Sequence, residues 1–142
     1  MATVKVDASA ARRLLEALKE HSDRVQAEFL RQGARLTVEE MKRKAPVRTG
    51  ALRRSIGVRA VEGGRVAVSP AVPYWHAVER GAKPRVILPK RGKVLAFEVD
   101  GRPVFARRAR WPGFPGRFFV RATEQAVRPK LRQLLLQLMK KR

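Results

Sequence analysis

The chain has 142 residues, and with 44% hydrophobic residues it is expected to fold around a core rather than to be disordered. It has no cysteine, which excludes disulfides and thiolate chemistry, and it has no apolar run of membrane-spanning length and no apolar signal core, so we expect assembly in the cytoplasm. The net charge of +21 implies a polyanionic partner, an acidic protein surface, or both.

A long amphipathic helix is predicted over about residues 8–44. Asp7 or Ser9 can cap its N-terminus. Apolar residues recur at three-, four- or seven-residue steps, namely Leu14, Leu18, Val25, Phe29 and Leu36, with Val38 and Met41 near the same stripe. The helix is either continuous, and then about 55 Å long at ~1.5 Å per residue, or broken near Ser22 and Asp23. A continuous helix either projects toward a neighbouring subunit or kinks and packs on the core, and the sequence leaves both readings open.

The segment "APVRTGALRRSI", residues 45–56, predicts a sharp change of chain direction. Pro46 ends the first helix, because the residue before a proline avoids the helical region. Thr49 and Gly50 predict a tight bend, since threonine hydrogen-bonds to nearby backbone and glycine can take a positive φ. Leu52 and Ile56 then resume an apolar spacing. The segment has no catalytic acid, metal ligand or thiol.

The middle of the chain predicts two β-hairpins separated by a short helix. Alternating apolar residues on both sides of Gly63-Gly64 indicate the first hairpin, and the second turns at Asp100-Gly101. Between them, "PYWHAVERG" predicts a short helical turn that ends at Gly81, followed by a short strand in "RVIL". The stretch "WPGFPG" is expected to be a rigid loop.

The predicted fold class is α+β, as a single domain over residues 1–142. It comprises the long N-terminal helix, a small antiparallel sheet of β-hairpins, the short middle helix and a C-terminal helix over about residues 117–141. Pro129 is expected to kink or restart this last helix. The helix has an apolar stripe, which is core in a monomer and part interface in an assembly: Leu131, Leu134, Leu135 and Leu138.

The two histidines, His21 and His76, do not indicate an active site. His21 lies among solvent-facing charges, and His76 with Glu79 has neither a nucleophile nor a third ligand, so a structural hydrogen bond is the favoured interpretation. A hydrolase built on this pair is the weakest alternative. There is no metal-ligand spacing, phosphate loop or dinucleotide fingerprint, so we predict no enzyme, no metal and no cofactor.

The basic charge is concentrated in the second part of the chain. Residues 1–44 have ten basic and seven acidic residues, whereas residues 45–142 have 23 basic and five acidic ones. Aromatic residues lie near these bases and could stack on nucleobases: Trp75, Phe97, Phe105 and Trp111. They also alternate as strand core positions do, and a core of this size is expected to need most of them. A nonspecific electrostatic contact with DNA stays open as an alternative function.

Four groups of residues, in order along nearly the whole chain, resemble the tail-component family of long-tailed bacteriophages, which are head–tail joining, tail-completion or neck proteins. The first group is Ala45, Pro46, Thr49, Gly50, Leu52, Ser55 and Ile56, and the second is Tyr74, Glu79 and Gly81. The third is Ile87, Pro89, Lys90, Lys93, Leu95 and Phe97, and the fourth is Pro112, Gly113, Phe118, Phe119 and Ala122. The family often has a histidine where this chain has Trp111.

The resemblance implies a structural virion protein that forms a ring, expected to be a homo-hexamer, around the DNA channel at the head–tail interface or the top of the tail. Its implied partners are other copies of itself, neighbouring phage connector, terminator or tail-tube proteins, and genomic DNA in the channel through nonspecific contact, with no membrane. Arginines near the bend and on the second hairpin are the candidate contact residues: Arg48, Arg53, Arg54, Arg107, Arg108 and Arg110. The alternative is that these arginines are only solvated.

Overall fold

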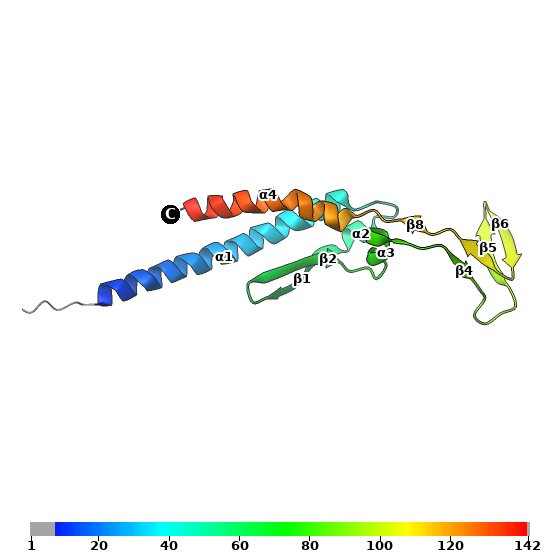
Figure 1. The fold of residues 1–142 in the computed structure, drawn as a ribbon, viewed down its shortest axis with the longest axis horizontal. Helices are drawn as coiled ribbons and strands as arrows, with labels where there is room; N and C mark the ends of the chain where they lie inside the picture. The colour runs from blue at the N-terminus through cyan, green and yellow to red at the C-terminus, as the bar shows by residue number, and fades with distance from the viewer. Residues whose placement is uncertain (1–7, 142) are drawn as a thin grey trace, which may run out of the picture. The chain divides into compact units, whose positions relative to one another are not determined.

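The structure is a computed structural model, and it describes residues 8–141 (Figure 1). The chain divides into two compact units, which are taken one at a time below. The helical unit comprises the chain up to Ala71 and from Phe119 onward, and the ribbon unit comprises Val72–Phe118. The single domain over residues 1–142 stays a prediction, because a division into compact units does not test whether each folds alone.

Helix α1 (Ser9–Lys44) is continuous, so a break near Ser22 and Asp23 is wrong. The helix begins after Ala8, whose carbonyl accepts the Arg12 N–H at 2.9 Å, so Ser9 lies inside the helix rather than capping it. The proposed cap at Asp7 lies outside the described residues. The helix ends at Ala45, whose ψ of 130° is the extended conformation that a following proline imposes.

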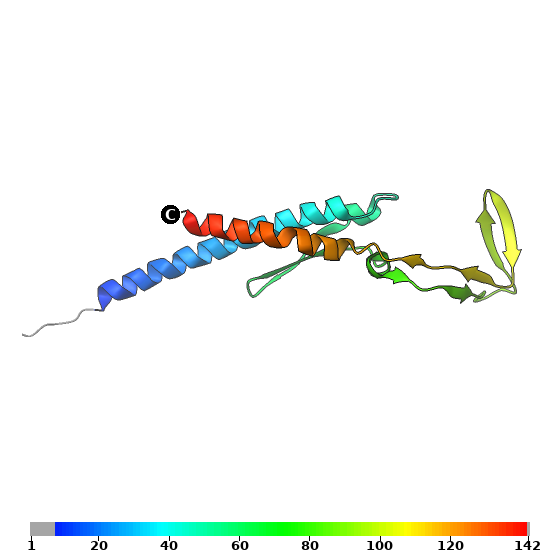
Figure 2. The ribbon, with the colours of Figure 1, turned by 45° about the horizontal axis from the view of Figure 1, so that its top comes forward.

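Helix α4 (Phe119–Lys140) lies antiparallel to the C-terminal part of α1 (Figures 1 and 2). It continues through Pro129, so a restart there is wrong. Packing against α1 offsets the lost backbone hydrogen bond, because Val127 and Leu138 on either side of the proline are buried. Gly33 on α1 allows the close approach, since a Cβ there would lie 3.0 Å from Cδ2 of Leu131.

A short helix and a β-hairpin complete the helical unit. Helix α2 (Ala51–Arg54) leads into strand β1 (Ile56–Glu62), which pairs antiparallel with β2 (Arg65–Pro70). Gly63 and Gly64 connect the strands with φ values of 51° and 75°, as a two-residue hairpin turn requires. The first hairpin is therefore where the sequence predicts it, with a register shift between Val58 and Ala60.

The ribbon unit starts with helix α3 (Trp75–Arg80) and is otherwise a series of paired strands. The strands are β3 (Gly81–Ala82), β4 (Arg85–Ile87), β5 (Leu95–Val99), β6 (Arg102–Ala106), β7 (Ala109–Trp111) and β8 (Phe114–Pro115). Pairing is nested: β5 with β6, β4 with β7, and β3 with β8, all antiparallel. The second hairpin turns at Asp100-Gly101, as predicted, and the two flanking ladders extend it.

The predicted α+β class is confirmed, and in residues 8–141 the sheet takes the form of separate two-stranded ladders. The core belongs to the helical unit, where the buried apolar residues are Met41, Ala45, Leu52, Ile56, Phe119, Val127 and Leu138. The expectation that most aromatics are core residues is wrong, because Phe119 is the one aromatic residue buried in the described part of the chain. The ribbon unit, all of which is described, has no buried residue.

Candidate interaction surfaces

The bend after α1 is built by local hydrogen bonds around Gly50. Thr49 Oγ1 accepts the Ala51 N–H at 3.4 Å, and the Gly50 carbonyl accepts the Arg54 N–H at 2.9 Å. Gly50 has a φ of 79°, a left-handed conformation that favours glycine. Leu52 then turns inward and is 6% exposed. The bend residues therefore fix the direction in which the chain enters the first hairpin.

The three arginines at the bend differ in their surroundings. Arg53 donates a hydrogen bond from Nη2 to the Ala45 carbonyl at 3.4 Å, which caps the C-terminal end of α1 with a cation. The Arg54 guanidinium lies over Gly50, with Nη1 2.8 Å from the place of a Cβ there. Arg48 is exposed. Arg53 and Arg54 are exposed like Arg48, so all three stay candidates for a partner, and Arg53 and Arg54 in addition contact the backbone of the bend.

A buried carboxylate that the sequence analysis missed joins α1 to α4. Glu40 is 4% exposed, and its Oε1 accepts hydrogen bonds from Lys130 Nζ and from Arg43 Nη1, the latter at 2.9 Å. These cations, Lys130 first, hold the pKa of Glu40 below its usual value of 4.5 even though desolvation acts in the opposite direction. The sequence feature that could have indicated its burial is the position of Glu40 directly before Met41, near the apolar stripe of the helix.

The second and fourth groups of resemblance residues meet at the base of the ribbon unit. The Val78 carbonyl accepts the Arg117 N–H at 2.8 Å, and the Glu79 carbonyl accepts the Phe118 N–H at 3.1 Å. Next to them, Gly81 pairs with Pro115 across β3 and β8. Segments that are more than thirty residues apart in the sequence are thus held together by backbone contacts.

Three glycines, Gly81, Gly113 and Gly116, make this close approach sterically feasible. A Cβ at Gly81 would lie 2.6 Å from the Phe114 carbonyl oxygen, and one at Gly113 would collide with the backbone from Ala82 to Pro84. Gly81 and Gly113 have a positive φ, and so does Phe118, at 48°, which is strained for a bulky residue. Pro112 and Tyr74 are exposed beside this base.

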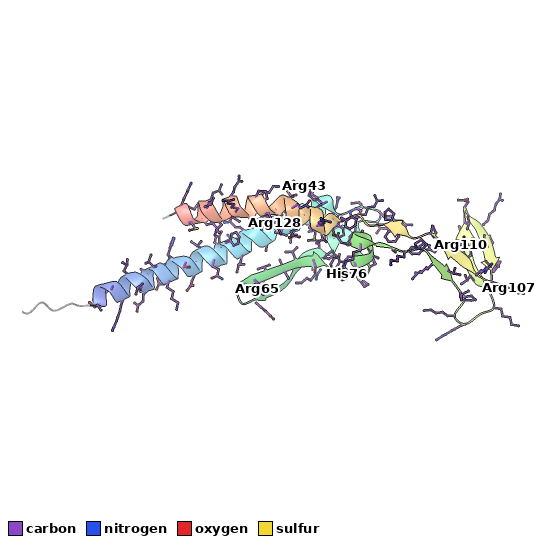
Figure 3. All side chains as sticks on the ribbon, in the orientation of Figure 1. Arg43, Arg65, His76, Arg107, Arg110 and Arg128 are labelled. Carbon is purple, nitrogen blue, oxygen red and sulfur yellow. The ribbon has the colours of Figure 1, made fainter. Side chains whose placement is uncertain are left out.

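The ribbon unit combines bases with exposed apolar side chains. It has eleven basic and three acidic residues, a net charge of +8. Arg107 and Arg108 lie between β6 and β7, and Arg110 lies opposite Val86 in the register of β4 and β7. Figure 3 labels Arg107 and Arg110 on this unit. All three arginines are exposed. A partner that covers the ribbon therefore meets positive charge and apolar surface together.

The aromatics named as stacking candidates fall into two kinds. Trp75 stacks on His76 with ring centroids 3.7 Å apart, and Trp111 contacts Phe114 edge-on while the Arg85 guanidinium lies 5.0 Å from its ring centroid. Phe97 and Phe105 are 39% and 69% exposed. The tryptophans thus have ring or cation partners within the chain, whereas the two phenylalanines present apolar surface outward.

Neither the acidic and histidine side chains of the described residues nor the hollow on α1 indicates a specific site. In residues 8–141, no group of three or more His, Asp and Glu side chains could hold a metal ion. A hollow of about 480 Å³ on α1 is lined by Arg31, Gln32, Arg35, Leu36 and Glu39. Its polar residues are engaged in helix-surface pairs, such as Arg35 with Glu39 at 3.4 Å, which is typical of a solvated helix face.

The exposed bases and apolar side chains described above are the contact elements that the two units present. Residues 9–81 match the family model described as "Bacteriophage HK97-gp10, putative tail-component". This match spans just over half of the 142 residues, and the chain belongs to this family of phage tail components, whose place is in the virion. Searches of curated proteins and of solved structures gave no significant match. Within residues 8–141, none of the helices has the length and apolarity that crossing a bilayer requires.

Proposed function

We propose that the protein forms a ring around the DNA channel at the head–tail interface or the top of the tail, as a tail-completion or head–tail connector protein. The observation that carries this proposal is the ribbon unit without buried residues. A two-stranded ribbon is marginal in water unless something packs on it. A ribbon with exposed apolar and basic residues is therefore a contact element that is completed by assembly.

A closed ring fits this chain because its contact elements differ from one another. Rings form when one surface of a subunit meets a different surface of the next, and here the candidate surfaces are the ribbon unit and the helical unit. We expect a homo-hexamer whose adjacent partners are phage connector, terminator or tail-tube proteins. The exposed arginines then face either DNA in the channel or acidic residues of an adjacent subunit or ring: Arg48, Arg53, Arg54, Arg107, Arg108 and Arg110.

Electron microscopy of the virion tests the proposal. The expected result is a closed ring of this chain between the capsid and the tail, with its copy number given by the symmetry of the map and by the mass of the purified ring. The proposal is overturned if purified virions contain no copies of the chain, or if the copies lie elsewhere in the tail.

A free DNA-binding protein is the second candidate, and the net charge of +8 on the ribbon unit favours it. Such a protein would bind duplex DNA as a monomer, and its affinity would fall steeply with salt, with a slope of about −0.9 per phosphate contacted. Retention on DNA at low salt by a monomer that is absent from virions supports this candidate over the ring.

A further inference from the structure

The β4–β7 and β5–β6 ladders of the ribbon unit meet at a junction whose two strands differ in length. The pair Ile87–Ala109 ends one ladder, and the pair Leu95–Ala106 begins the other. Between these pairs, residues 88–94 on one strand lie opposite residues 107–108 on the other. The short side bridges the two ladders in three chain steps, a span of at most about 11 Å, so the longer loop closes over the same span.

Five basic residues gather at this junction, three on the loop and two on the facing strand: Lys90, Arg91, Lys93, Arg107 and Arg108. We name them the basic junction. All five are exposed, and none forms an ion pair with a carboxylate in the part of the chain that the structure describes. At physiological salt the Debye length is about 8 Å, so cations held within this span repel one another and favour a bound anion.

Positive charge continues from the basic junction along both strands of the ribbon. Residues 80–97 have six basic residues and no acidic one, and residues 101–118 have five basic residues and no acidic one. A local patch of carboxylates on a folded protein would match the junction alone. Duplex DNA has one phosphate about every 1.7 Å along its axis, so it matches the charge of the whole ribbon.

The form of the ribbon also suits duplex DNA. The major groove is about 12 Å wide and admits a two-stranded β-ribbon. The ribbon unit has no buried residue, so none of its own elements covers the strands. The pairs Arg85–Trp111 and Val86–Arg110 are successive in the register of β4 and β7, so Arg85 and Arg110 lie on opposite faces. Bases therefore leave the ribbon on both sides, as contact with both walls of a groove requires.

A second copy of the chain does not offer a matching anionic surface in its described residues. Five of the acidic residues form ion pairs within α1, within α4 or between these helices: Glu20, Glu28, Glu39, Glu40 and Glu124. The other described acidic residues are spread over α1, the first hairpin, α3 and the second hairpin. The anion that neutralises the basic junction is therefore of a different kind.

We propose that the basic junction binds backbone phosphates of duplex DNA. The inference deepens the proposed function and rests on it for the source of the DNA, which is the genome in the channel. Phosphate contacts position a protein on DNA without reading its sequence, so the binding is nonspecific. The competing occupant is an acidic protein surface, which would also cover Leu88 and Val94 at the two ends of the loop, 64% and 48% exposed. The continuity of positive charge along the ribbon favours DNA.

Binding of a fluorescent duplex of mixed sequence to the purified full chain, measured by anisotropy over a range of salt concentrations, tests the contact. The junction variant combines five substitutions: Lys90→Gln, Arg91→Gln, Lys93→Gln, Arg107→Gln and Arg108→Gln. The matched control has the same net charge, because it replaces five exposed bases of the helical unit: Arg12→Gln, Arg13→Gln, Lys19→Gln, Arg132→Gln and Lys140→Gln. All of these residues are exposed, so both variants are expected to keep the wild-type circular dichroism spectrum.

The slope of log affinity against log salt is expected to become shallower by about 0.9 for each phosphate contact that the junction variant loses. The control variant is expected to keep the wild-type slope. Arg107→Gln alone is expected to change the slope by about 0.9, which keeps the contact testable with a fold that five substitutions do not burden.

Three results would overturn the proposal. The first is a wild type that does not bind the duplex, and the second is an equal loss of affinity in the junction and control variants. The third is competition by polyglutamate that equals competition by unlabelled duplex at the same concentration of negative charge. This last result assigns the basic junction to an acidic protein surface.

Tethered cleavage locates the contact in the virion. Leu88→Cys places one thiol beside the basic junction, and iron–EDTA attached there cleaves DNA that lies close to it. The wild type has no cysteine, stays unlabelled and supplies the background. Labelled virions are expected to show cleavage of the genome near one end. Virions that contain the ring but show only background cleavage overturn the contact.

The outcomes separate this inference from the proposed function. A ring between capsid and tail, together with DNA binding that is insensitive to the junction variant, overturns the inference and leaves the proposed function standing. DNA binding that depends on the basic junction, in a chain that is absent from virions, overturns the proposed function and retains the contact with phosphates.

Discussion

Lys130 on α4 donates a hydrogen bond to the carboxylate of Glu40 on α1, ninety positions earlier in the sequence. The Glu40 side chain is 5% exposed and the Lys130 side chain 45%, so the lysine reaches from the surface to a carboxylate buried between the helices. The contact sets the relative position of α1 and α4 by charge as well as by packing. It also makes the stability of the helix pair depend on pH.

We predict that Lys130→Met destabilises the protein at neutral pH and raises the pKa of Glu40. The lysine hydrogen bond lowers the pKa of Glu40 from 4.5, so its stabilisation is fully present above pH 4.5 and is lost as the pH falls through the lowered value. The difference in melting temperature between wild type and Lys130→Met should therefore shrink below pH 4.5.

The matched control is Lys140→Met, an exposed lysine near the end of the same helix. It should leave the pKa of Glu40, measured by carboxyl-detected NMR, where it is in the wild type. A Glu40 that titrates identically in wild type and Lys130→Met would show that the lysine is not its main partner.

Gly50→Ala should destabilise the protein by about 1–2 kcal/mol, because alanine is penalised in the left-handed region that Gly50 occupies. The cost is mainly in the backbone, since the nearest atom is the movable end of Arg54. Gly57→Ala is the control, because a Cβ there meets nothing within 4 Å, and its stability should stay within about 0.5 kcal/mol of wild type. Urea denaturation measures both, and equal effects would refute a special role for the bend.

Leu52→Ala should destabilise the helical unit by about 2–5 kcal/mol through a cavity below the bend. Val47→Ala, five residues earlier, truncates a side chain that is 56% exposed and should change stability by about 0.5 kcal/mol or less. Thermal denaturation of both variants checks this, and a Leu52→Ala protein as stable as wild type would contradict the placement of Leu52 in the core.

Gly113→Ala should open the base of the ribbon unit. Its Cβ would collide with the backbone of residues 82–84, and backbone cannot be moved aside as a flexible side chain can. Gly101→Ala at the second hairpin turn has a similar φ, 77° against 73°, but meets nothing within 4 Å. Hydrogen exchange of the assembled protein should show faster exchange in β3 and β4 for Gly113→Ala than for Gly101→Ala. Equal exchange would mean that the close approach is unimportant.

The features that could be predicted from the sequence are those that neighbouring residues determine. Pro46 ends α1, and Gly63-Gly64 and Asp100-Gly101 form the hairpin turns, because each depends on the φ preferences of a few adjacent residues. The continuity of α4 through Pro129 could not be read this way, since packing against α1 overrides the local preference.

The pairings of β3 with β8 and of β4 with β7 also could not be predicted from the sequence pattern. Residues 88–94 lie opposite only residues 107 and 108, so the registers of the inner and outer ladders differ, and no short-range signal specifies that offset. The exposure of Phe97 and Phe105 contradicts the usual link between alternating aromatics and a core. On the bend, the internal contacts of Arg53 and Arg54 depend on the three-dimensional turn rather than on their charge.

The nested pairing of the ribbon has a mechanical consequence. A force that separates Gly81 from Pro115 loads the pair at the base first, then β4 with β7, and reaches the hairpin of β5 and β6 last. The hydrogen bonds between the strands then break one after another, so a small force is enough to open the ribbon. A force along the strands instead loads the bonds of a ladder together, in shear. The ribbon would therefore resist a force that slides its two strands past each other far better than a force that pulls the strands apart at the base.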